Sequence, residues 1–273
     1  MLEKLFYGEN LWLLFLVSLT IFLLVFEIGY RIGKRKKEST DEATKSWITT
    51  IEQVMLGLLS LLLAFSFGMA EHRFDARREL VVDEANAIGT TYLRAQWLAE
   101  PQRTEISNLL RRYVDVRLPQ APQTRKMEET LRQMVDQSDR LQIQLWSHAV
   151  EIAKKEAASP IAALFIATLN DTIDLHAKRL AAFRNRVPEI ILALLYIFAG
   201  FSLLITGYVS GFGSRRSFLA MFTITGLLAS LLSLIVDLDR PQRGFIKVSQ
   251  ESLIRLQQQM KADATVQEGT KAP

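Results

Sequence analysis

Residue types that support catalysis or metal binding are few in this sequence. The 273 residues include three histidines and no cysteine. His72, His148 and His176 lie far apart in the chain and form no pair spaced for one helix face, so a histidine metal site has little to build on. Without cysteine there is no disulfide framework, no thiolate metal site and no thiol nucleophile. We therefore predict no catalytic residue, cofactor or metal, and we do not expect an enzyme.

Two aspartates follow the last apolar segment, in the sequence VDLDRP. Asp237 is the first charged residue after a long uncharged run and is expected at or just inside a membrane interface, where ionisable groups usually have partners or functions. Arg240 can pair with it one turn later, and Pro241 ends the helix. A structural clamp is one interpretation, and an ion-entry or cation-binding role for Asp237 and Asp239 is the alternative. Calcium is not indicated, because it needs six to eight oxygen ligands.

A densely charged segment, RFDARRELVVDEANAIG, follows the second apolar segment. Several of its charges can pair at one-turn spacing along a helix, which is typical of a solvated, self-paired surface. Adjacent acids point to different sides of a helix, so the segment is a poor catalytic candidate. The candidate interface or ion-entry residues here are Arg77, Arg78, Asp83, Glu84 and Asn86.

Small residues recur on one face of the second apolar segment. This face comprises Gly57, Ser60, Ala64, Phe67 and Gly68, at intervals of three and four. Small residues at this spacing let two membrane helices approach closely, so helix packing is the first interpretation. The alternative is a face that lines a pore, with small and aromatic side chains forming a hydrophobic constriction.

Four apolar segments are long enough to cross a bilayer as helices, which requires about 20 residues each. They cover residues 10–26, 54–70, 190–209 and 217–236. The first resembles an uncleaved anchor, because its basic cluster follows the apolar run. Net charge is only +4 with both signs interleaved, which argues against a nucleic-acid partner. We predict a multi-pass protein whose partner is the lipid bilayer.

The charged region between the second and third apolar segments is predicted to be helical throughout. No proline occurs between Ala70 and Pro101, so the second membrane helix can continue outside the bilayer. Further helices are expected from Pro101, from about Met127 and from Ser159-Pro160. The predicted domains are residues 1–53 (anchor helix and basic loop), 54–258 (with extramembrane helices at 71–186) and 259–273 (disordered polar tail). The fold class is all-α, with four transmembrane helices and an inserted helical domain.

Four ordered stretches of this sequence resemble the bestrophin-like family of bacterial membrane proteins. They are LLSLLLAFSFGMAEHRFDARRELVVDEANAIGTTYLRA, LLRRYVDVRL (with Arg111 and Arg112), LNDTIDLHAKRL and VDLDRPQRGFIKVS. The resemblance covers about residues 50–256, outside the first helix and the tail. It implies a remote relation to bestrophins, which are pentameric anion channels, and hence a homo-oligomeric channel for chloride or other small anions. It also implies a pore lined by the second membrane helix and residence in a bacterial inner membrane.

Two points stay open at this stage. Basic residues after the first membrane helix place that loop in the cytoplasm and the large domain outside, whereas the resemblance places the domain in the cytoplasm. The functional alternative to a channel is a membrane-anchored helical scaffold without transport activity, since the heptad-like helices of the inserted region contain no recognisable chemistry.

Overall fold

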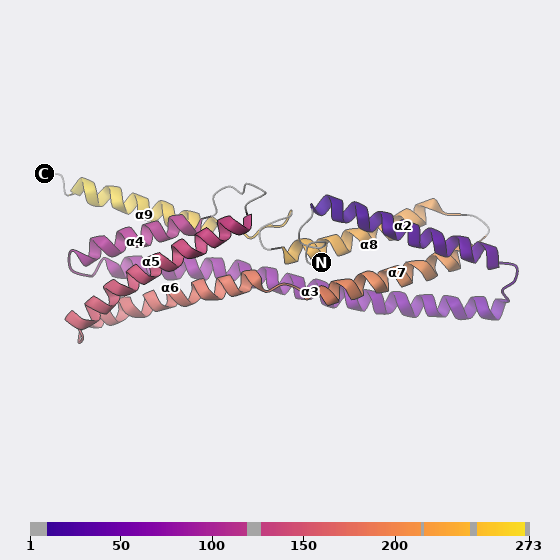
Figure 1. Ribbon diagram of the computed structural model, residues 1–273, viewed down its shortest axis with the longest axis horizontal. Coiled ribbons are helices and arrows are strands. Elements are labelled where there is room, and N and C mark those ends of the chain that lie inside the picture. The colour runs from indigo at the N-terminus through magenta and orange to yellow at the C-terminus, as the bar shows by residue number, and fades with distance from the viewer. Residues whose placement is uncertain (1–9, 119–126, 214–215, 241–244, 271–273) are drawn as a thin grey trace. The chain divides into compact units, whose positions relative to one another are not determined.

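The described residues are helical nearly throughout. In a computed structural model they are 10–118, 127–213, 216–240 and 245–270 (Figure 1). The helices are α2 (Leu11–Lys36), α3 (Glu42–Ala95), α4 (Gln102–Arg117), α5 (Met127–Lys155), α6 (Pro160–Arg184), α7 (Glu189–Gly211), α8 (Phe218–Asp239) and α9 (Glu251–Thr270). No strand occurs in these ranges, so the predicted all-α class is confirmed for them.

Helix ends follow local sequence signals. The side chain of Asn10 accepts a hydrogen bond from the Trp12 N–H at 3.2 Å and caps α2. Ser217 caps α8 in the same way, through the Ala220 N–H at 3.3 Å. Proline begins or precedes α4, α6 and α7, because a proline at a helix start loses no intrahelical hydrogen bond.

Four helical segments are long and apolar enough to cross a membrane, as the sequence predicts. They are α2, the apolar part of α3, α7 and α8. α3 is a single helix of 54 residues that begins before its apolar segment and ends at Ala95. The expectation that the second span continues unbroken into the charged region therefore holds.

The chain divides into two compact units, one of which contains the apolar segments. Unit 1 comprises residues 1–75 and 185–247. In it, α2 packs on α7 and α8. The buried face of α2, with Phe22 and Phe26, belongs to the same core as Leu195 and Leu232. The predicted boundary between residues 1–53 and 54–258 stays a prediction.

The contact between α2 and α7 depends on four glycines. A Cβ added at Gly29 or Gly33 would overlap the carbonyl oxygens of Leu204 and Tyr208 on α7. A Cβ at Gly207 would overlap the Phe26 carbonyl oxygen, and one at Gly211 would lie 2.6 Å from that of Tyr30. The two backbones thus touch directly through Gly-xxx-Gly pairs on both helices, the close approach that small residues permit in membranes.

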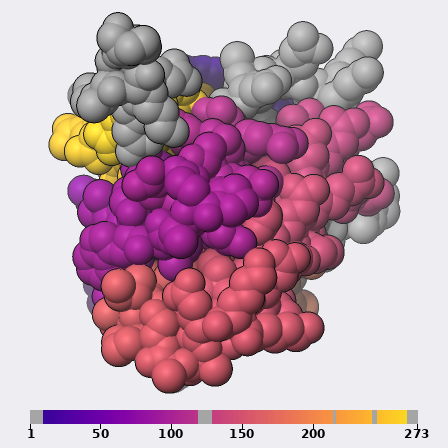
Figure 2. Space-filling view, turned by 90° about the vertical axis from the view of Figure 1, so that its left-hand side faces the viewer, coloured from indigo at the N-terminus to yellow at the C-terminus, as the bar shows by residue number. Residues whose placement is uncertain are grey.

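Unit 2 comprises residues 76–184 and 248–273. Its core contains Ile88, Tyr113, Leu145 and Phe165, one from each of α3 to α6. α9 lies against α4 (Figure 2, α9 in yellow and α4 in purple). The predicted disordered tail from residue 259 differs from the structure, in which α9 continues to Thr270. Leu253, Leu256 and Met260 recur at intervals of three and four and bury that helix face in the core of unit 2.

Candidate functional site

One face of the apolar part of α3 is exposed within the chain. Gly57, Ser60, Ala64 and Gly68 are exposed, and a Cβ added at either glycine would meet no atom within 4 Å. The opposite face of the helix, with buried Leu59, Leu63, Ser66 and Ala70, packs in unit 1. These four small residues are thus exposed in the single chain, and helix packing within one chain does not explain them.

Phe67 differs from the other four residues of the predicted face. It is half-buried and packs against the core of unit 1. At 100° per residue it lies toward the edge of the face, nearer to Leu63. The exposed aromatic ring in this region is that of Phe65, with 66% of its surface accessible.

Charged side chains of both signs continue this face beyond the apolar segment. Glu71, Asp75 and Arg78 follow Gly68 at intervals of three and four, and all three are exposed. Residues at this spacing lie along one side of a helix. The same side of α3 therefore changes from small and apolar to charged within two turns.

A buried ion cluster lies on the other side of α3, in unit 2, outside the apolar segments. Glu84 has no exposed surface, and its carboxylate accepts hydrogen bonds from Arg117 Nε at 2.8 Å and Nη2 at 3.3 Å. Arg179 Nη1 donates to the same carboxylate, and its Nη2 donates to Gln250 Oε1 at 2.6 Å. One carboxylate thus joins α3, α4 and α6 with the segment that precedes α9.

The electrostatics of this cluster keep Glu84 ionised. Burial raises the pKa of Glu84, but the guanidinium groups of Arg117 and Arg179 lower it further, so the pKa lies below its usual value. Burial also lowers the pKa of Arg179, which its contact with Glu84 partly offsets. Removal of any member would leave a buried charge without its partner.

His176 borders the cluster and is buried. Its Nδ1 lies 3.9 Å from Glu84 Oε1, and its Nε2 lies 3.5 Å from Asp139 Oδ1 on α5. Neither ring nitrogen has a hydrogen-bond partner in the described part of the chain. Burial and then the charge of Arg117 hold the pKa of His176 below its usual value.

The other predicted interface residues of unit 2 are not brought together. Arg77 is buried, whereas Arg78, Asp83 and Asn86 are exposed. Arg111 donates to Asn108 Oδ1 at 2.5 Å, one turn earlier in α4. Of the other predicted residues in unit 2, Glu84 lies at the centre of the ion cluster, whereas Arg112 is exposed.

Asp237, Asp239 and Arg240 are all buried at the end of α8. The carboxylate of Asp237 accepts hydrogen bonds from the N–H groups of Phe245 and Ile246, at 3.0–3.1 Å. Asp239 Oδ2 accepts from the Val187 N–H at 2.9 Å, just before α7. The two aspartates hold the chain on either side of the helix end. Pro241, the last predicted residue, lies outside the described residues.

Sequence reasoning did not single out Arg117, Arg179 or His176. Arg117 is the last charged residue of the stretch LLRRYVDVRL, in which only Arg111 and Arg112 are predicted site residues. An available signal was the spacing: Arg117 follows the buried positions Leu110, Tyr113 and Val114 on the same helix face. An arginine on an apolar face requires a buried acid, and Glu84 supplies it.

The side chains of the α3 face, the Glu84 cluster and the end of α8 offer charges, hydrogen bonds and packing contacts. Within the described ranges no group of three or more histidine, cysteine, aspartate or glutamate residues is placed to hold a metal ion. The carboxylate of Glu84 is already occupied by two guanidinium groups. The exposed face of α3, with Gly57, Ser60, Ala64 and Gly68, is the candidate functional site.

Comparisons with known proteins give one family and one fold. A family model for the bestrophin-like domain matches residues 19–253, and no curated protein matches the chain. The match begins within α2, earlier than the expected residue 50. A bacterial bestrophin homologue from Klebsiella pneumoniae has a similar structure, with a TM-score of 0.62 at 12% identity over 90% of this chain and 96% of that chain. A homologue from the same organism with a point mutation has a TM-score of 0.62 at 14% identity, over 90% and 97% of the two chains.

Proposed function

The chain belongs to the bestrophin-like family, and from this premise we propose that it forms a homo-oligomeric ion channel in a bacterial inner membrane, with α3 lining the pore. The exposed small-residue face of α3 supports this proposal most directly. A membrane helix that lies at the surface of one chain must meet lipid, another chain or water. Gly57, Ser60, Ala64 and Gly68 offer little apolar area to lipid, and they suit a narrow passage between copies of the chain.

Small anions are the proposed permeant ions, and this choice rests on the family resemblance. The charged continuation of the α3 face contains Glu71 and Asp75 as well as Arg78. In a ring of identical subunits each of these charges is repeated around the axis, where rings of charge select ions by sign. Neutralising Arg78 is therefore expected to favour cations, and neutralising Glu71 and Asp75 to favour anions.

The test is current through purified protein in planar bilayers. Gly57→Leu and Ala64→Leu place larger side chains on the proposed pore face and are expected to lower the single-channel conductance severalfold or abolish it. Gly200→Leu is the matched control, because a Cβ at Gly200 on α7 also meets no atom within 4 Å. Reversal potentials in a chloride gradient report the sign of the permeant ion.

Two outcomes would contradict the proposal. A well-folded oligomer that passes no current under any salt gradient or voltage would exclude a channel. Equal loss of current in Gly57→Leu and Gly200→Leu would exclude α3 as the lining helix, since both substitutions add the same volume to an open position of a membrane helix.

A scaffold without transport activity is the second candidate, favoured by exposed apolar side chains on α5. Ile143, Trp146 and Val150 are 68%, 40% and 39% exposed and lie on one side of the helix. Such a row indicates a contact with another protein surface. A second copy of this chain fits the channel proposal, whereas a different protein that co-purifies in fixed ratio with a non-conducting complex would favour the scaffold.

A further inference from the structure

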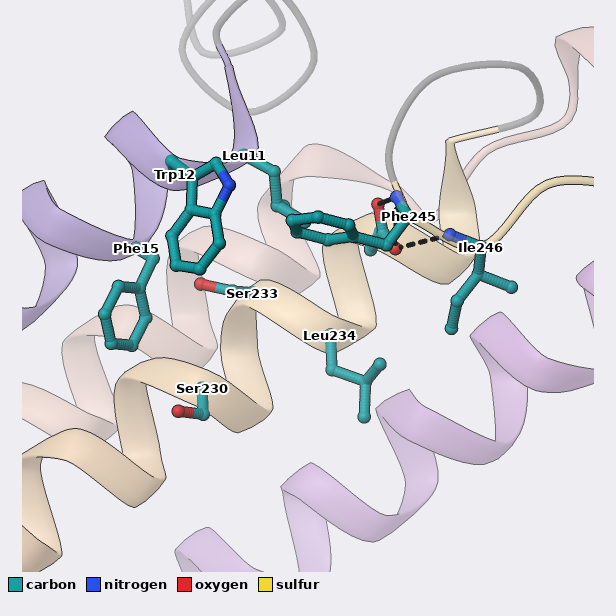
Figure 3. Close-up of a pocket in the computed structure, with 9 residues that line it drawn as sticks. Leu11, Trp12, Phe15, Ser230, Ser233, Leu234, Phe245 and Ile246 are labelled. Atoms are coloured by element: carbon teal, nitrogen blue, oxygen red, sulfur yellow. Dashed lines mark hydrogen bonds between the residues drawn. The ribbon is translucent and has the colours of Figure 1, made fainter.

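A pocket of about 290 Å³ opens in unit 1 between the start of α2, the last turns of α8 and the segment that follows α8 (Figure 3). Its lining residues are Leu11, Trp12, Phe15, Ser230, Ser233, Leu234, Asp237, Phe245 and Ile246. Most of its wall is apolar, and its polar groups come from three positions on α8. The pocket thus has a mainly apolar lining with a few polar groups, which is typical of ligand-binding sites.

Asp237 supplies the charge of the pocket. Its side chain is almost completely buried, and its carboxylate accepts hydrogen bonds only from the N–H groups of Phe245 and Ile246 among the described residues. A carboxylate has about four acceptor positions, so these two donors leave capacity for another. No lysine, arginine or histidine of the described ranges lies within ion-pair distance of it.

Ser233 lies one helical turn before Asp237 and also lines the pocket. Ser233 is 6% exposed, and its hydroxyl oxygen has no hydrogen-bond partner in the described part of the chain. Ser230 differs, because its hydroxyl donates to the Gly226 carbonyl oxygen at 2.8 Å. A buried hydroxyl without a partner is costly, so Ser233 is a second polar group of the pocket that can take part in a hydrogen bond.

Aromatic rings form the outer wall. Trp12 and Phe245 pack edge to face with ring centroids 5.5 Å apart, and Trp12 packs likewise against Phe15 at 6.4 Å. Figure 3 shows the Trp12 and Phe245 rings side by side, with Ser233 below them. Trp12 and Phe245 remain 60% and 66% exposed. Rings of this kind attract cations to their faces.

The position of the pocket indicates where its ligand comes from. It lies at the ends of two membrane helices, next to the α2 cap Asn10 and to the first charges after the apolar run of α8. Tryptophan at such a position is typical of the headgroup level of a bilayer. A molecule that enters here has its polar end at the depth of Asp237 and its apolar end beside Phe15 and Leu234.

We propose that this pocket binds a membrane lipid whose headgroup carries a primary ammonium. The ammonium donates hydrogen bonds to the Asp237 carboxylate and to the Ser233 hydroxyl, below the rings of Trp12 and Phe245. The part of an acyl chain nearest the headgroup lies along Phe15 and Leu234. A quaternary ammonium head is also attracted by the carboxylate and the rings, but it has no N–H to donate and makes neither hydrogen bond, so the site favours the primary ammonium.

The test uses Trp12 as the reporter in full-length protein reconstituted into vesicles. Trp47, Trp97 and Trp146 are replaced by phenylalanine, and quenching of Trp12 fluorescence by dibrominated lipids is measured. Brominated phosphatidylethanolamine in a phosphatidylcholine bilayer is compared with brominated phosphatidylcholine in phosphatidylethanolamine, at equal mole fraction and with identical chains. We expect phosphatidylethanolamine to occupy the site with about tenfold preference, the scale of one hydrogen bond to a charged group.

Variants and a second reporter separate the pocket from the bulk lipid. In Asp237→Asn and Ser233→Ala, we expect the ratio of phosphatidylethanolamine to phosphatidylcholine binding to fall toward 1:1. Ser230→Ala is expected to keep the ratio of the unaltered protein, since the Ser230 hydroxyl already donates a hydrogen bond within its helix. Ser233→Ala keeps the proposal testable if loss of the Asp237 contacts to Phe245 and Ile246 disturbs folding. A protein with Trp47 as its single tryptophan, 69% exposed elsewhere in unit 1, is expected to show no preference.

Equal quenching of Trp12 by the two lipids in the otherwise unaltered protein would overturn the proposal. Preference for phosphatidylcholine would do the same, because a headgroup without N–H donors would then bind better than one that can donate to Asp237 and Ser233. If the preference for phosphatidylethanolamine persists undiminished in both Asp237→Asn and Ser233→Ala, these two polar groups do not bind the headgroup. None of these readouts requires ion current, so their failure is distinct from failure of the channel proposal.

Discussion

His176 is the buried ionisable group most sensitive to mild acid. Charged and titratable groups face it from every helix packed around it: Glu84 on α3, Tyr113 and Arg117 on α4, Asp139 on α5 and Arg179 on its own helix α6. Burial and the two guanidinium charges outweigh the two carboxylates, so the pKa of His176 is lower in the folded chain than the unfolded value of about 6.5. At neutral pH the imidazole is therefore uncharged.

This lowered pKa predicts a loss of stability on acidification. Below about pH 6.5 the unfolded chain binds a proton at His176 more readily than the folded chain, so the free energy of unfolding falls as the pH falls through this window. We expect the thermal unfolding midpoint in detergent to decrease between about pH 7.5 and about pH 5.5, and His176→Gln to reduce this decrease.

The control for this prediction is His148→Gln, which removes a more exposed histidine on α5. Glu84, the buried carboxylate beside His176, has a lowered pKa and stays ionised in the same window. If His176→Gln loses stability on acidification as steeply as the unaltered protein, the pH dependence arises elsewhere and the assignment to His176 is wrong.

At the scale of elements, the α2–α7 contact is the least tolerant of added volume. Gly207→Ala would place a methyl group against the Phe26 carbonyl, and neither backbone can yield without parting the helices. We expect a loss of about 1–3 kcal/mol in unfolding free energy, the usual effect of overpacking. Gly200→Ala on the same helix is the control, because its Cβ meets open space. Unfolding by graded denaturing detergent, followed by circular dichroism, compares them, and equal midpoints would contradict the direct backbone contact.

The sequence predicts individual helices well because their signals are local. The apolar length of α7 and α8, the proline before α4 and the serine cap of α8 each depend on a few neighbouring residues. The helix that runs on into the predicted tail depends on a contact that is not local. Of the α9 residues in the core of unit 2, only Met260 lies beyond residue 258, and a single core residue in a polar segment does not indicate a helix.

Contacts between segments that are far apart in the sequence are harder to predict from the sequence. Glu84, Arg117 and Arg179 are each ordinary charged residues in helical sequence, and only the fold brings them to one point. The role of α2 is a similar case: its length predicts a membrane helix, but Gly29 and Gly33 acquire meaning only beside Gly207 and Gly211. The small-residue face of α3 was predicted from spacing as a packing or pore-lining face, and that prediction remains untested; four of its residues are exposed in the single chain, whereas Phe67 is half-buried, because spacing alone does not resolve the edge of a helix face.

At the scale of the whole molecule, one chain leaves surfaces that a second copy would cover. The small-residue face of α3 belongs to unit 1, and the apolar row of α5 belongs to unit 2. Both are open in the single chain, although they differ in chemistry: the first suits a narrow aqueous passage and the second suits a dry contact. In the ring of copies that we propose, the two surfaces have separate tasks: the α5 row holds the subunits together, and the α3 face stays open to ions.

This division predicts that assembly can be broken without unfolding the chain. Ile143 is 68% exposed, so Ile143→Glu costs the isolated subunit little but puts a charge into a dry contact between subunits. By analogy with the family we expect the unaltered protein to have the mass of five chains of 31.1 kDa in size-exclusion chromatography with light scattering, and Ile143→Glu to shift it toward one chain. Gln144→Glu adds the same charge at the next residue and should leave the assembly intact. Helix content by circular dichroism should be equal in all three. An Ile143→Glu protein that stays fully assembled would place the subunit contact away from α5, and the subunits would then have to meet through another surface.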